Sequence, residues 1–599
     1  MKLTPIIALL MCLTTALAGV GEYSAQESST FKLSLLAIDN EGRGRIVDVY
    51  ITVSTPGKGI VTIIPSNAFS QDTLLSFKLA LVYSSLLTGE DYKRLDYTIS
   101  VQGIAQVEGT SATLLFTVFA ISLLRNESFD SLKSATGIIG PGGIVGRVGG
   151  IPQKVDAAKS SGLKLVAGPF TANITDEIYQ PVLTVFQAYE KFSETRLFPE
   201  LNYENIYSPS LSTYFEEVWM NFYNKTSIIV ELLNKSMWVD SFFENSLNLL
   251  NLSTKYAEER HYYTASSIAF QAYYHGYSSL LNYSYHTSPH DFDNNVTSIR
   301  ERVEETRMLI EEKIQLETCY NPLIIDLYVN ALKRIEESEE ALRAADESVD
   351  LIYRIGNYSY SLARAETSLA WVNAVNAYER RNCIASSMLN TYLARIRELL
   401  STSISYYEAM SYLIGFPPVP YTGNSFLDLV YTFKAFEEMT EQLYYNPALI
   451  RNEIFPALNH PSIKESLFNS LKTISIYVMS KLGLLIPSII TMIEFLTDAS
   501  TMDQRTDPLI IQLMILHAYA YSFLVFTLPY TVEQGPTYLF DPTVISSSLI
   551  PFLVILCMTG FSLILLSLSR ISIKEYQLRL RGFFPQSGNS WFNHICEVF

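Results

Sequence analysis

Two side chains in the first third of the chain have the chemistry of a catalytic pair: Ser111 in the segment VEGTSATLLF and Lys154 in the segment GGIPQK. A serine attacks a peptide bond only when a base accepts its proton, and a lysine amine serves as that base only in its neutral form. The glycines before Lys154 predict a closely packed setting, and Pro152 is typical of the first turn of a helix. Burial and the positive end of the helix dipole would both lower the pKa of the Lys154 amine.

Each of these residues has a simpler interpretation when it is taken alone, because a serine before an apolar run is an ordinary helix N-cap and most lysines lie on the surface. Catalysis that depends on histidine or cysteine is excluded from residues 31–170. The first histidine of the chain is His261, and no cysteine occurs between Cys12 and Cys319, so neither a Ser-His-Asp triad nor a Cys-His pair can form there. The glycine-rich segment GPGGIVGR lacks the G-K-[ST] of a P-loop and the spacing of a dinucleotide-binding loop.

The elements that would position Ser111 and Lys154 alternate between strands and helices. Apolar residues at every second position predict strands, and longer apolar runs that end at turn residues such as Gly89 predict helices. The helix that follows Ser111 would offer free backbone N–H groups to an oxyanion. The expected strands are RIVDVYITV, GIVTIIP, LDYTISVQGIAQVEG and LKLVAGP, and the expected helices are TLLSFKLALVYSSLLTG, SATLLFTVFAISLL and QKVDAAKSSG.

The surroundings of both residues resemble the proteolytic domain of the Lon protease family, which uses a Ser-Lys dyad. The matching elements, in the family's order, are Gly109 with Ser111 and Ala112, the pair Thr136–Gly137, the segment GGIPQK, the pair Ala157–Ala158, and the strand GLKLVAGP. This resemblance covers about residues 31–170 and implies an α+β Lon-type proteolytic domain. It implies Ser111 as nucleophile, Lys154 as general base, and Thr136 as the hydroxyl that orients the lysine.

The segment departs from the family pattern at three positions. Thr110 stands where the family usually has proline, Thr113 where it usually has glycine, and Ile138 where an acidic residue is frequent. Thr110 and Thr113 flank the nucleophile, and Thr113 bears most directly on the geometry of the oxyanion site. None of the three changes removes the dyad.

Residues 176–470 change in character and become helical, rich in tyrosine, and acidic. Apolar residues at helical spacing predict a bundle or an irregular helical array, with the charged runs on solvated faces. The two clearest stripes are Ile299, Val303, Ile310 and Ile314, and Leu332, Ile335, Leu342, Ala345, Val349 and Ile352.

Apolar segments at both ends predict export and membrane anchoring. Residues 1–18 have the pattern of a secretory signal peptide, with an uncleaved N-terminal anchor as the alternative. Three apolar stretches follow residue 470: about 473–496, which contains Lys481 and Glu494, then 508–530, and then 544–569, which has no charge. Arginines and a lysine after residue 569 place the C-terminus in the cytoplasm, so one or three spans fit an exported N-terminus.

The region between these segments carries further marks of an extracytoplasmic domain. Cys319 and Cys383 are its only cysteines, so one disulfide can form. Eight N-x-[ST] sequons would be available for glycosylation outside the cytoplasm. They begin at Asn126, Asn173, Asn224, Asn234, Asn251, Asn282, Asn295 and Asn357.

The expected organisation is a signal peptide (1–18), a Lon-like proteolytic domain (19–175), an extracytoplasmic helical domain (176–470), a membrane region with one to three transmembrane helices (471–569) and a cytoplasmic tail (570–599). The chain has no Walker A sequence, so the resemblance points to an archaeal-type, membrane-anchored form without the ATPase module. The expected function is ATP-independent cleavage of unfolded or membrane-proximal extracytoplasmic proteins in the cell membrane. We expect protein or peptide substrates, contact with membrane lipid, and no cofactor.

Three other interpretations remain at this point. The chain could be a non-catalytic surface receptor or assembly protein that keeps a Lon-like fold, or a component of a transporter. His286, His290, Asp291 and Asp293 could bind a metal, although a polar loop between helices explains them as well. A formal net charge of −17 argues against nucleic acid as a partner, and a homo-oligomer is left open.

Overall fold

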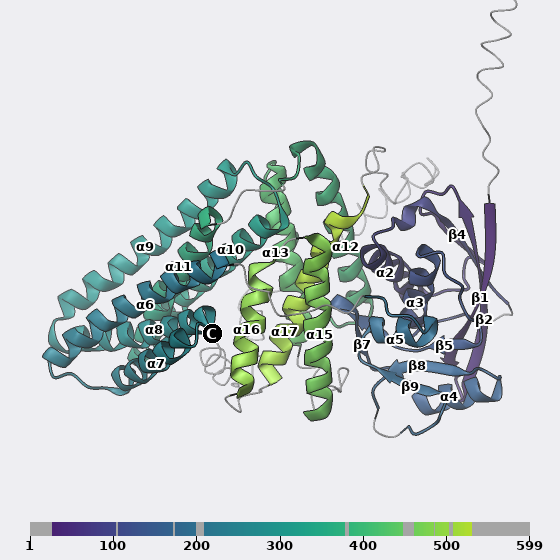
Figure 1. The fold of residues 1–599 in the computed structure, drawn as a ribbon, viewed down its shortest axis with the longest axis horizontal. Helices are drawn as coiled ribbons and strands as arrows, with labels where there is room; N and C mark the ends of the chain where they lie inside the picture. The colour runs from purple at the N-terminus through teal and green to yellow at the C-terminus, as the bar shows by residue number, and fades with distance from the viewer. Residues whose placement is uncertain are drawn as a thin grey trace, which may run out of the picture. The chain divides into compact units, whose positions relative to one another are not determined.

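The computed structural model describes residues 27–102, 106–171, 174–198, 209–377, 383–446, 461–483, 485–501 and 507–529. The expected signal peptide 1–18, the third apolar stretch 544–569, the tail 570–599 and the sequon at Asn173 lie outside the described residues. The described part is a mixed α/β fold in which helices predominate (Figure 1). A region of strands and helices comes first in the chain, and helices alone follow it.

The first sheet is a four-stranded layer in the order β1-β2-β4-β3. Its strands are β1 (Glu27–Ile38), β2 (Gly44–Thr55), β3 (Val61–Ile64) and β4 (Asp96–Val101), and only the β3–β4 pair is parallel. The alternation in β2 buries Val49, Ile51 and Val53, which confirms the predicted strand face. The sequence did not predict β1, because its exposed first third, ESST, has no apolar alternation.

Short strands and four helices complete the α/β region. Helix α2 ends where Gly89 adopts a left-handed conformation, as the sequence predicts, and α2 packs against the fully apolar α3. The remaining strands form a parallel sheet in the order β5-β8-β9 and a β6–β7 hairpin. The bounds are α2 (Gln71–Thr88), α3 (Thr113–Leu124), β5 (Lys133–Ala135), β6 (Ile138–Gly140), β7 (Ile144–Gly146), α4 (Ile151–Ser160), β8 (Leu165–Pro169), β9 (Tyr179–Val182) and α5 (Val185–Ser193), with short 3-10 turns η1 (Tyr92–Arg94) and η2 (Pro141–Gly143).

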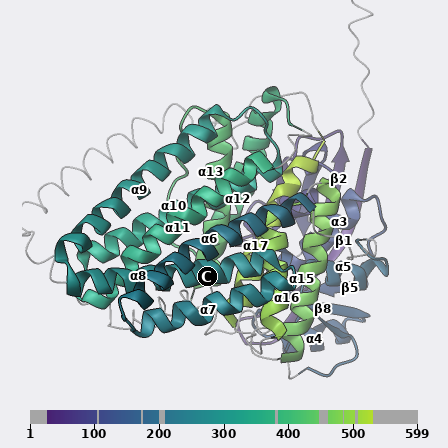
Figure 2. The same ribbon diagram turned by 60° about the vertical axis from the view of Figure 1, so that its left-hand side comes forward.

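Long antiparallel helices make up most of the remaining chain (Figures 1 and 2). The first predicted stripe is confirmed, since all four of its isoleucine and valine residues on α9 are buried. The second is wrong beyond Ala345, because α10 ends at Glu347 and the chain turns before α11, which leaves Val349 and Ile352 exposed. These helices are α6 (Pro209–Lys235), α7 (Ser241–Glu258), α8 (Tyr262–Thr287), α9 (Pro289–Leu316), α10 (Pro322–Glu347), α11 (Leu351–Ala377), α12 (Leu389–Ala409) and α13 (Ser425–Tyr444).

Three further helices lie between the α/β region and the α6–α11 helices in both ribbon views (Figures 1 and 2). They are α15 (Pro461–Leu482), α16 (Pro487–Thr501) and α17 (Asp507–Ser522), and the turn η5 (Phe523–Thr527) follows. The window Ile510–Thr527 is long and apolar enough to cross a membrane, yet 89% of it is buried inside the protein. Tyr521 of α17, for example, stacks on Tyr83 of α2 and donates a hydrogen bond to its carbonyl.

The charged residues of the first apolar stretch also have protein partners. Lys481 donates to the carbonyl of Leu87 at the end of α2, and Glu494 accepts from the backbone N–H of Thr264 at the start of α8. The stretch is divided between α15 and α16, with Gly483 ending the first helix. Both described apolar stretches therefore contact the α/β or helical region directly, and the number of spans stays a prediction.

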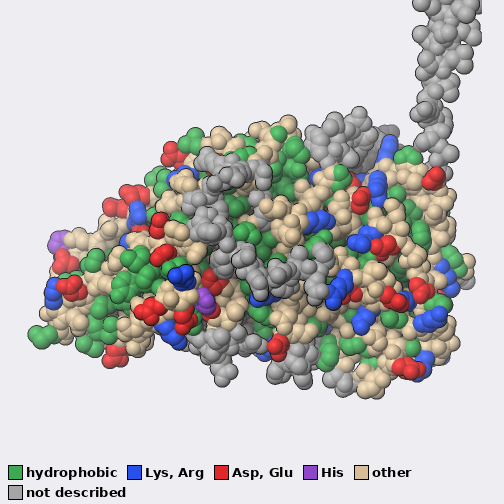
Figure 3. Space-filling view, viewed as in Figure 1, with side chains coloured by type: hydrophobic (Ala, Val, Ile, Leu, Met, Phe, Trp, Pro, Cys, Tyr) green, Lys and Arg blue, Asp and Glu red, His purple; other side chains and the backbone are tan. Residues whose placement is uncertain are grey.

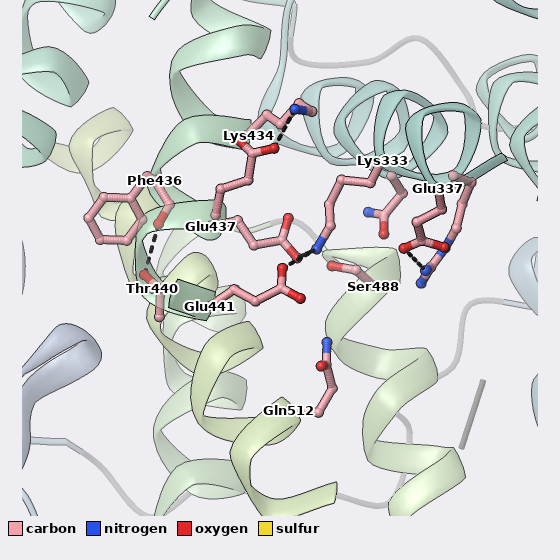
Figure 4. Close-up of polar contacts among 12 residues, drawn as sticks. Lys333, Glu337, Lys434, Phe436, Glu437, Thr440, Glu441, Ser488 and Gln512 are labelled. Atoms are coloured by element: carbon pink, nitrogen blue, oxygen red, sulfur yellow. Dashed lines mark hydrogen bonds and ion pairs between the residues drawn. The ribbon is translucent and has the colours of Figure 1, made fainter. Parts of the chain in front are cut away.

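A buried polar cluster joins α10, α13 and α16 (Figure 4). The amine of Lys333 lies 2.7 Å from Glu437 and 3.4 Å from Glu441. Asp326, which is fully buried, accepts hydrogen bonds from the backbone N–H and the hydroxyl of Ser488 at the start of α16. Burial raises the pKa of Asp326 to about 7. These contacts fix α16 against α10 by hydrogen bonding as well as by apolar packing.

One disulfide links Cys319 to Cys383, as the cysteine count allows, across a separation of 64 residues. The bond joins the chain before α10 to the segment before α12. On the face drawn in Figure 3, acidic and basic side chains are interspersed.

Candidate active site

Ser111 lies in the turn that leads from Gly109 into α3. Gly109 has φ +94°, a conformation that side-chain-bearing residues rarely adopt, so the turn depends on glycine. Helix α3 begins after Ala112, and no side chain caps its first N–H groups. The simpler interpretation of Ser111 as an N-cap therefore does not describe its position, and its half-buried side chain is left for another role.

Lys154 lies in the first turn of α4, which starts after Gly150 and contains Pro152 as the sequence predicts. Its side chain is only 3% exposed. Burial lowers the pKa of the Lys154 amine to about 8, and no carboxylate in the described part of the chain opposes this effect. Asp156, two residues away, is exposed on the other side of the helix turn. A substantial fraction of the amine is thus neutral near pH 8, as a general base requires.

Thr136 connects the two. It directly follows β5, is fully buried, and accepts a hydrogen bond of 3.1 Å from the Lys154 amine. Its own hydroxyl donates to the carbonyl oxygen of Ser111 across 3.3 Å, and the next residue, Gly137, donates its N–H to the same oxygen at 2.8 Å. The structure therefore brings Ser111, Thr136 and Lys154 into one hydrogen-bonded chain, although they lie on three separate elements.

The start of α3 also presents backbone donors beside Ser111. The N–H of Thr113 is used by the carbonyl of Thr110, and the N–H of Leu114 by the carbonyl of Gly137. Among the contacts within the described residues, the N–H groups of Ser111 and Ala112 have no acceptor. Unpaired N–H groups at a helix start next to a nucleophile are suited to hold a developing oxyanion.

The three departures from the family pattern are accommodated by packing. Thr110 is 9% exposed and its hydroxyl lies 3.1 Å from the sulfur of Met410. The hydroxyl of Thr113 donates to the Thr110 carbonyl and lies 2.9 Å from the hydroxyl of Tyr406. Ile138 is buried. Tyr406 lies on α12 and Met410 directly follows that helix, so the helical region contacts the serine turn directly.

Sequence reasoning missed these α12 contacts because nothing local marks them. Residues 113 and 406 are 293 positions apart, and the segment STSISYYEAM has the pattern of an ordinary amphipathic helix. The one local feature that could have indicated the contact is the pair of adjacent tyrosines, Tyr406 and Tyr407. Both are buried, although α12 presents other faces to solvent.

The segment HTSPHDFDNN, which contains His286 and His290, does not form a metal centre among the described residues. His286 packs against the ring of Trp238, with centroids 5.8 Å apart, and His290 lies in the exposed first turn of α9. Among the described residues, no group of three or more His, Cys, Asp or Glu side chains is arranged to hold a metal ion. The predicted polar loop is wrong in its secondary structure, because Ser288 alone separates α8 from α9 and the four residues lie on those two helices.

Comparison with known proteins adds no relative to this picture: no protein-family model matches the chain, and no curated protein sequence matches it. The site is therefore interpreted from its own geometry. That geometry combines a half-buried serine, unpaired N–H groups, and a buried amine with a lowered pKa, joined through one threonine. The hydrogen bonds reach the Ser111 carbonyl oxygen rather than its hydroxyl, and the arrangement contains the groups that acyl transfer by a serine requires.

Proposed function

We propose that this chain is an ATP-independent serine endopeptidase of the Lon-like type, with Ser111 as nucleophile and Lys154 as general base. The observation that supports it most is the state of Lys154. Burial of this amine, which is 3% exposed and has no carboxylate partner among the described residues, costs stability, and groups retained at such a cost cluster at functional sites.

In the proposed reaction, the neutral amine of Lys154 accepts the hydroxyl proton of Ser111 as its oxygen attacks the peptide carbonyl carbon. The carbonyl oxygen becomes an oxyanion held by the N–H groups of Ser111 and Ala112. The ammonium of Lys154 then returns its proton to the leaving amine as the peptide bond breaks, which leaves an ester on Ser111. Water, deprotonated by Lys154, hydrolyses that ester and restores the serine.

Thr136 would position the base. Its hydroxyl donates to the Ser111 carbonyl, so its lone pairs are directed at the Lys154 amine and accept from it. This arrangement leaves the remaining positions on the amine nitrogen for the serine hydroxyl. A threonine at this position therefore orients the Lys154 amine without the negative charge of a carboxylate, which would stabilise the protonated form of the amine.

We propose that the peptidase is anchored by the 544–569 stretch and faces outward. The two described apolar stretches already have protein neighbours, and the disulfide is typical of an oxidising compartment. A single span after an exported N-terminus agrees with the basic residues that follow position 569. Such an enzyme has no ATP and no unfolding motor, so we expect unfolded, flexible or membrane-proximal protein substrates.

The test is cleavage of an unfolded casein-type substrate by membranes that contain the full chain, without ATP. Ser111→Ala and Lys154→Met should each lower turnover by a factor of about 1,000 or more, because they remove nucleophile or base. Lys159→Met is the matched control, since Lys159 lies on the same helix but is exposed and paired with Asp176. Equal turnover by all four proteins would exclude the peptidase and favour the receptor or assembly role.

A further inference from the structure

The backbone of residues 139–142 is bound at four points by side chains of the helical region. Tyr406 of α12 accepts from the N–H of Ile139 at 3.4 Å, and the next residue, Tyr407, donates to the Ile139 carbonyl at 3.1 Å. Tyr444 of α13 donates to the carbonyl of Pro141 at 2.7 Å. His517 of α17 lies 2.9 Å from the carbonyl of Gly142 through its Nε2. We call these four side chains the loop clamp.

All four clamp side chains are buried, with exposures from 0% to 2%. They come from three helices that lie far from the loop in the sequence and converge on one short segment. Buried hydroxyl and imidazole groups are costly unless they are hydrogen-bonded, so these contacts specify one position of the loop relative to the helices.

The clamped segment is continuous with the candidate site. Thr136 and Gly137, which bind the Ser111 carbonyl, come two to three residues before Ile139. The hydroxyl of Tyr406 also lies 2.9 Å from that of Thr113, in the first turn of the helix that follows Ser111. Tyr406 therefore contacts both β6, which begins two residues after Thr136, and the first residue of α3, which begins two residues after Ser111.

The approach of α17 to the loop is equally close. A Cβ atom added to Gly142 would lie 2.7 Å from the His517 ring and 3.0 Å from the Ala518 Cα, which is too near for any side chain. The other imidazole nitrogen of His517 lies 3.0 Å from the hydroxyl of Ser475 on α15. Both imidazole nitrogens of His517 therefore have a polar partner, which fixes the orientation of the ring against the loop.

We propose that Tyr406, with its clamp partners Tyr407, Tyr444 and His517, is a positioning residue of the Ser111–Lys154 site. The inference rests on the proposed peptidase function. On this view the helical region completes the site, because it sets the distance between β6, which follows Thr136, and α3, which follows Ser111. The positioning acts through backbone and hydroxyl contacts, so its loss should lower kcat more than it raises KM.

The first variant is Tyr406→Phe, which keeps the ring and removes the hydroxyl that contacts Thr113 and Ile139. The matched control is Tyr328→Phe, since Tyr328 is also buried within the helical region. Its hydroxyl lies 3.0 Å from the carboxylate of Glu317 and 3.3 Å from the backbone carbonyl oxygen of Lys313. In the full-length protein, Tyr406→Phe should lower kcat about tenfold, with KM changed less than about twofold. Tyr328→Phe should leave kcat per folded molecule unchanged.

A second pair of variants tests the same contact from the loop side. Gly142→Ala and Gly143→Ala both place an alanine at a left-handed position, with φ +77° and +82°. Only the first collides with His517, because a Cβ at Gly143 meets its neighbours at an ordinary 3.6 Å. Gly142→Ala should lower kcat well below that of Gly143→Ala at equal folded fraction.

Amide hydrogen exchange separates this inference from the proposed function. Peptides that cover 136–146 should exchange faster in Tyr406→Phe and not in Tyr328→Phe. Unchanged kcat in Tyr406→Phe, or a loss fully explained by its folded fraction, overturns the positioning role while peptidase activity stands. If Tyr406→Phe exchanges faster but the wild-type protein shows no Ser111-dependent cleavage, the peptidase function is overturned. The catalytic role proposed for the loop clamp is then overturned with it.

Discussion

The amine of Lys154 donates a hydrogen bond to the hydroxyl of Thr136 across 3.1 Å, and this contact fixes the direction of an amine that burial keeps partly neutral. Lys154 enters from the first turn of α4, whereas Thr136 follows a strand of the β5-β8-β9 sheet. Because the threonine hydroxyl also donates to the Ser111 carbonyl, displacement of either side chain would move the Lys154 amine relative to Ser111.

The first prediction concerns the pH dependence of cleavage. In the proposed mechanism the reacting form of Lys154 is the neutral amine, and burial lowers the pKa of this amine to about 8. We therefore expect kcat/KM to rise about tenfold per pH unit below pH 8 and to level off above it. Steady-state cleavage of an unfolded substrate between pH 5.5 and 9.5 measures this profile. A flat profile across that range would exclude Lys154 as the base.

Substitutions at Thr136 should shift the same profile. Thr136→Val removes an acceptor of the charged amine, so the apparent pKa should fall below that of the wild type while the plateau rate also falls. Thr136→Ser keeps the hydroxyl and should restore both. If valine and serine behave alike, the threonine hydroxyl does not orient the base.

The second prediction concerns stability and follows from the same pKa with its sign worked out. The Lys154 pKa is about 8 in the folded protein and 10.5 in an ordinary environment, so between these values the unfolded chain binds more protons and stability rises with pH. Below pH 8 the folded protein holds a buried charge, at a cost of about 3 kcal/mol. Lys154→Met should therefore increase the free energy of unfolding at pH 6.5, and the gain should vanish near pH 10.5.

Denaturant midpoints of the detergent-solubilised protein at these two pH values provide the measurement. Lys159→Met is again the control, because an exposed lysine paired with Asp176 gives no stabilisation on removal. A destabilised Lys154→Met at pH 6.5 would mean that the amine is held by a contact other than Thr136 and that burial is not the dominant effect.

The local elements of the α/β region could be predicted from sequence, because their signals are short-range. Gly89 ends α2, Pro152 begins α4, and the resemblance to Lon proteases selects the three residues that the structure joins by hydrogen bonds. The contact between Thr113 and Tyr406 could not be predicted, since it depends on how two elements 293 residues apart pack together. Similarly, the apolar spacing of the sequence predicts a helix that continues through Val349, whereas α10 ends at Glu347 and Val349 is exposed.

The third prediction sorts the sequons by accessibility. Asn282 and Asn357 are buried, and their amide nitrogens donate to Asp240 and to the carbonyl of Tyr353, so a glycan on either would remove a buried contact. We expect glycans, where the chain is exported, on the exposed sequons. Glycopeptide mass spectrometry of the native membrane protein should find them at Asn126, Asn224, Asn234 and Asn251.

Matched glutamine variants check this assignment. Asn224→Gln should increase gel mobility without changing the thermal midpoint, because its side chain is exposed. Asn282→Gln should leave mobility unchanged and lower the midpoint, since a longer side chain cannot keep the 2.8 Å contact with Asp240. A glycan found on Asn282 would contradict the described packing of α8.

The fourth prediction concerns the buried ion pairs between α10 and α13 (Figure 4). Glu437 is 2% exposed, and Lys333 lies 2.7 Å from it. Lys333→Met should lower the free energy of unfolding by about 3–5 kcal/mol, because it leaves a buried carboxylate without its cation. The double variant Lys333→Met/Glu437→Leu should recover most of this loss, since two apolar side chains can replace a buried pair at little cost.

The comparison uses an exposed pair of the same type. Lys235 and Glu231 pair on the surface of α6, with side chains 72% and 67% exposed, so Lys235→Met should leave the denaturation midpoint unchanged within error. A double variant no more stable than Lys333→Met alone would show that Lys333 acts through packing of its aliphatic chain. Because this cluster also adjoins the Asp326–Ser488 contact, its loss should loosen α16 before it affects the dyad, which hydrogen exchange in α16 would detect as a separate, earlier opening.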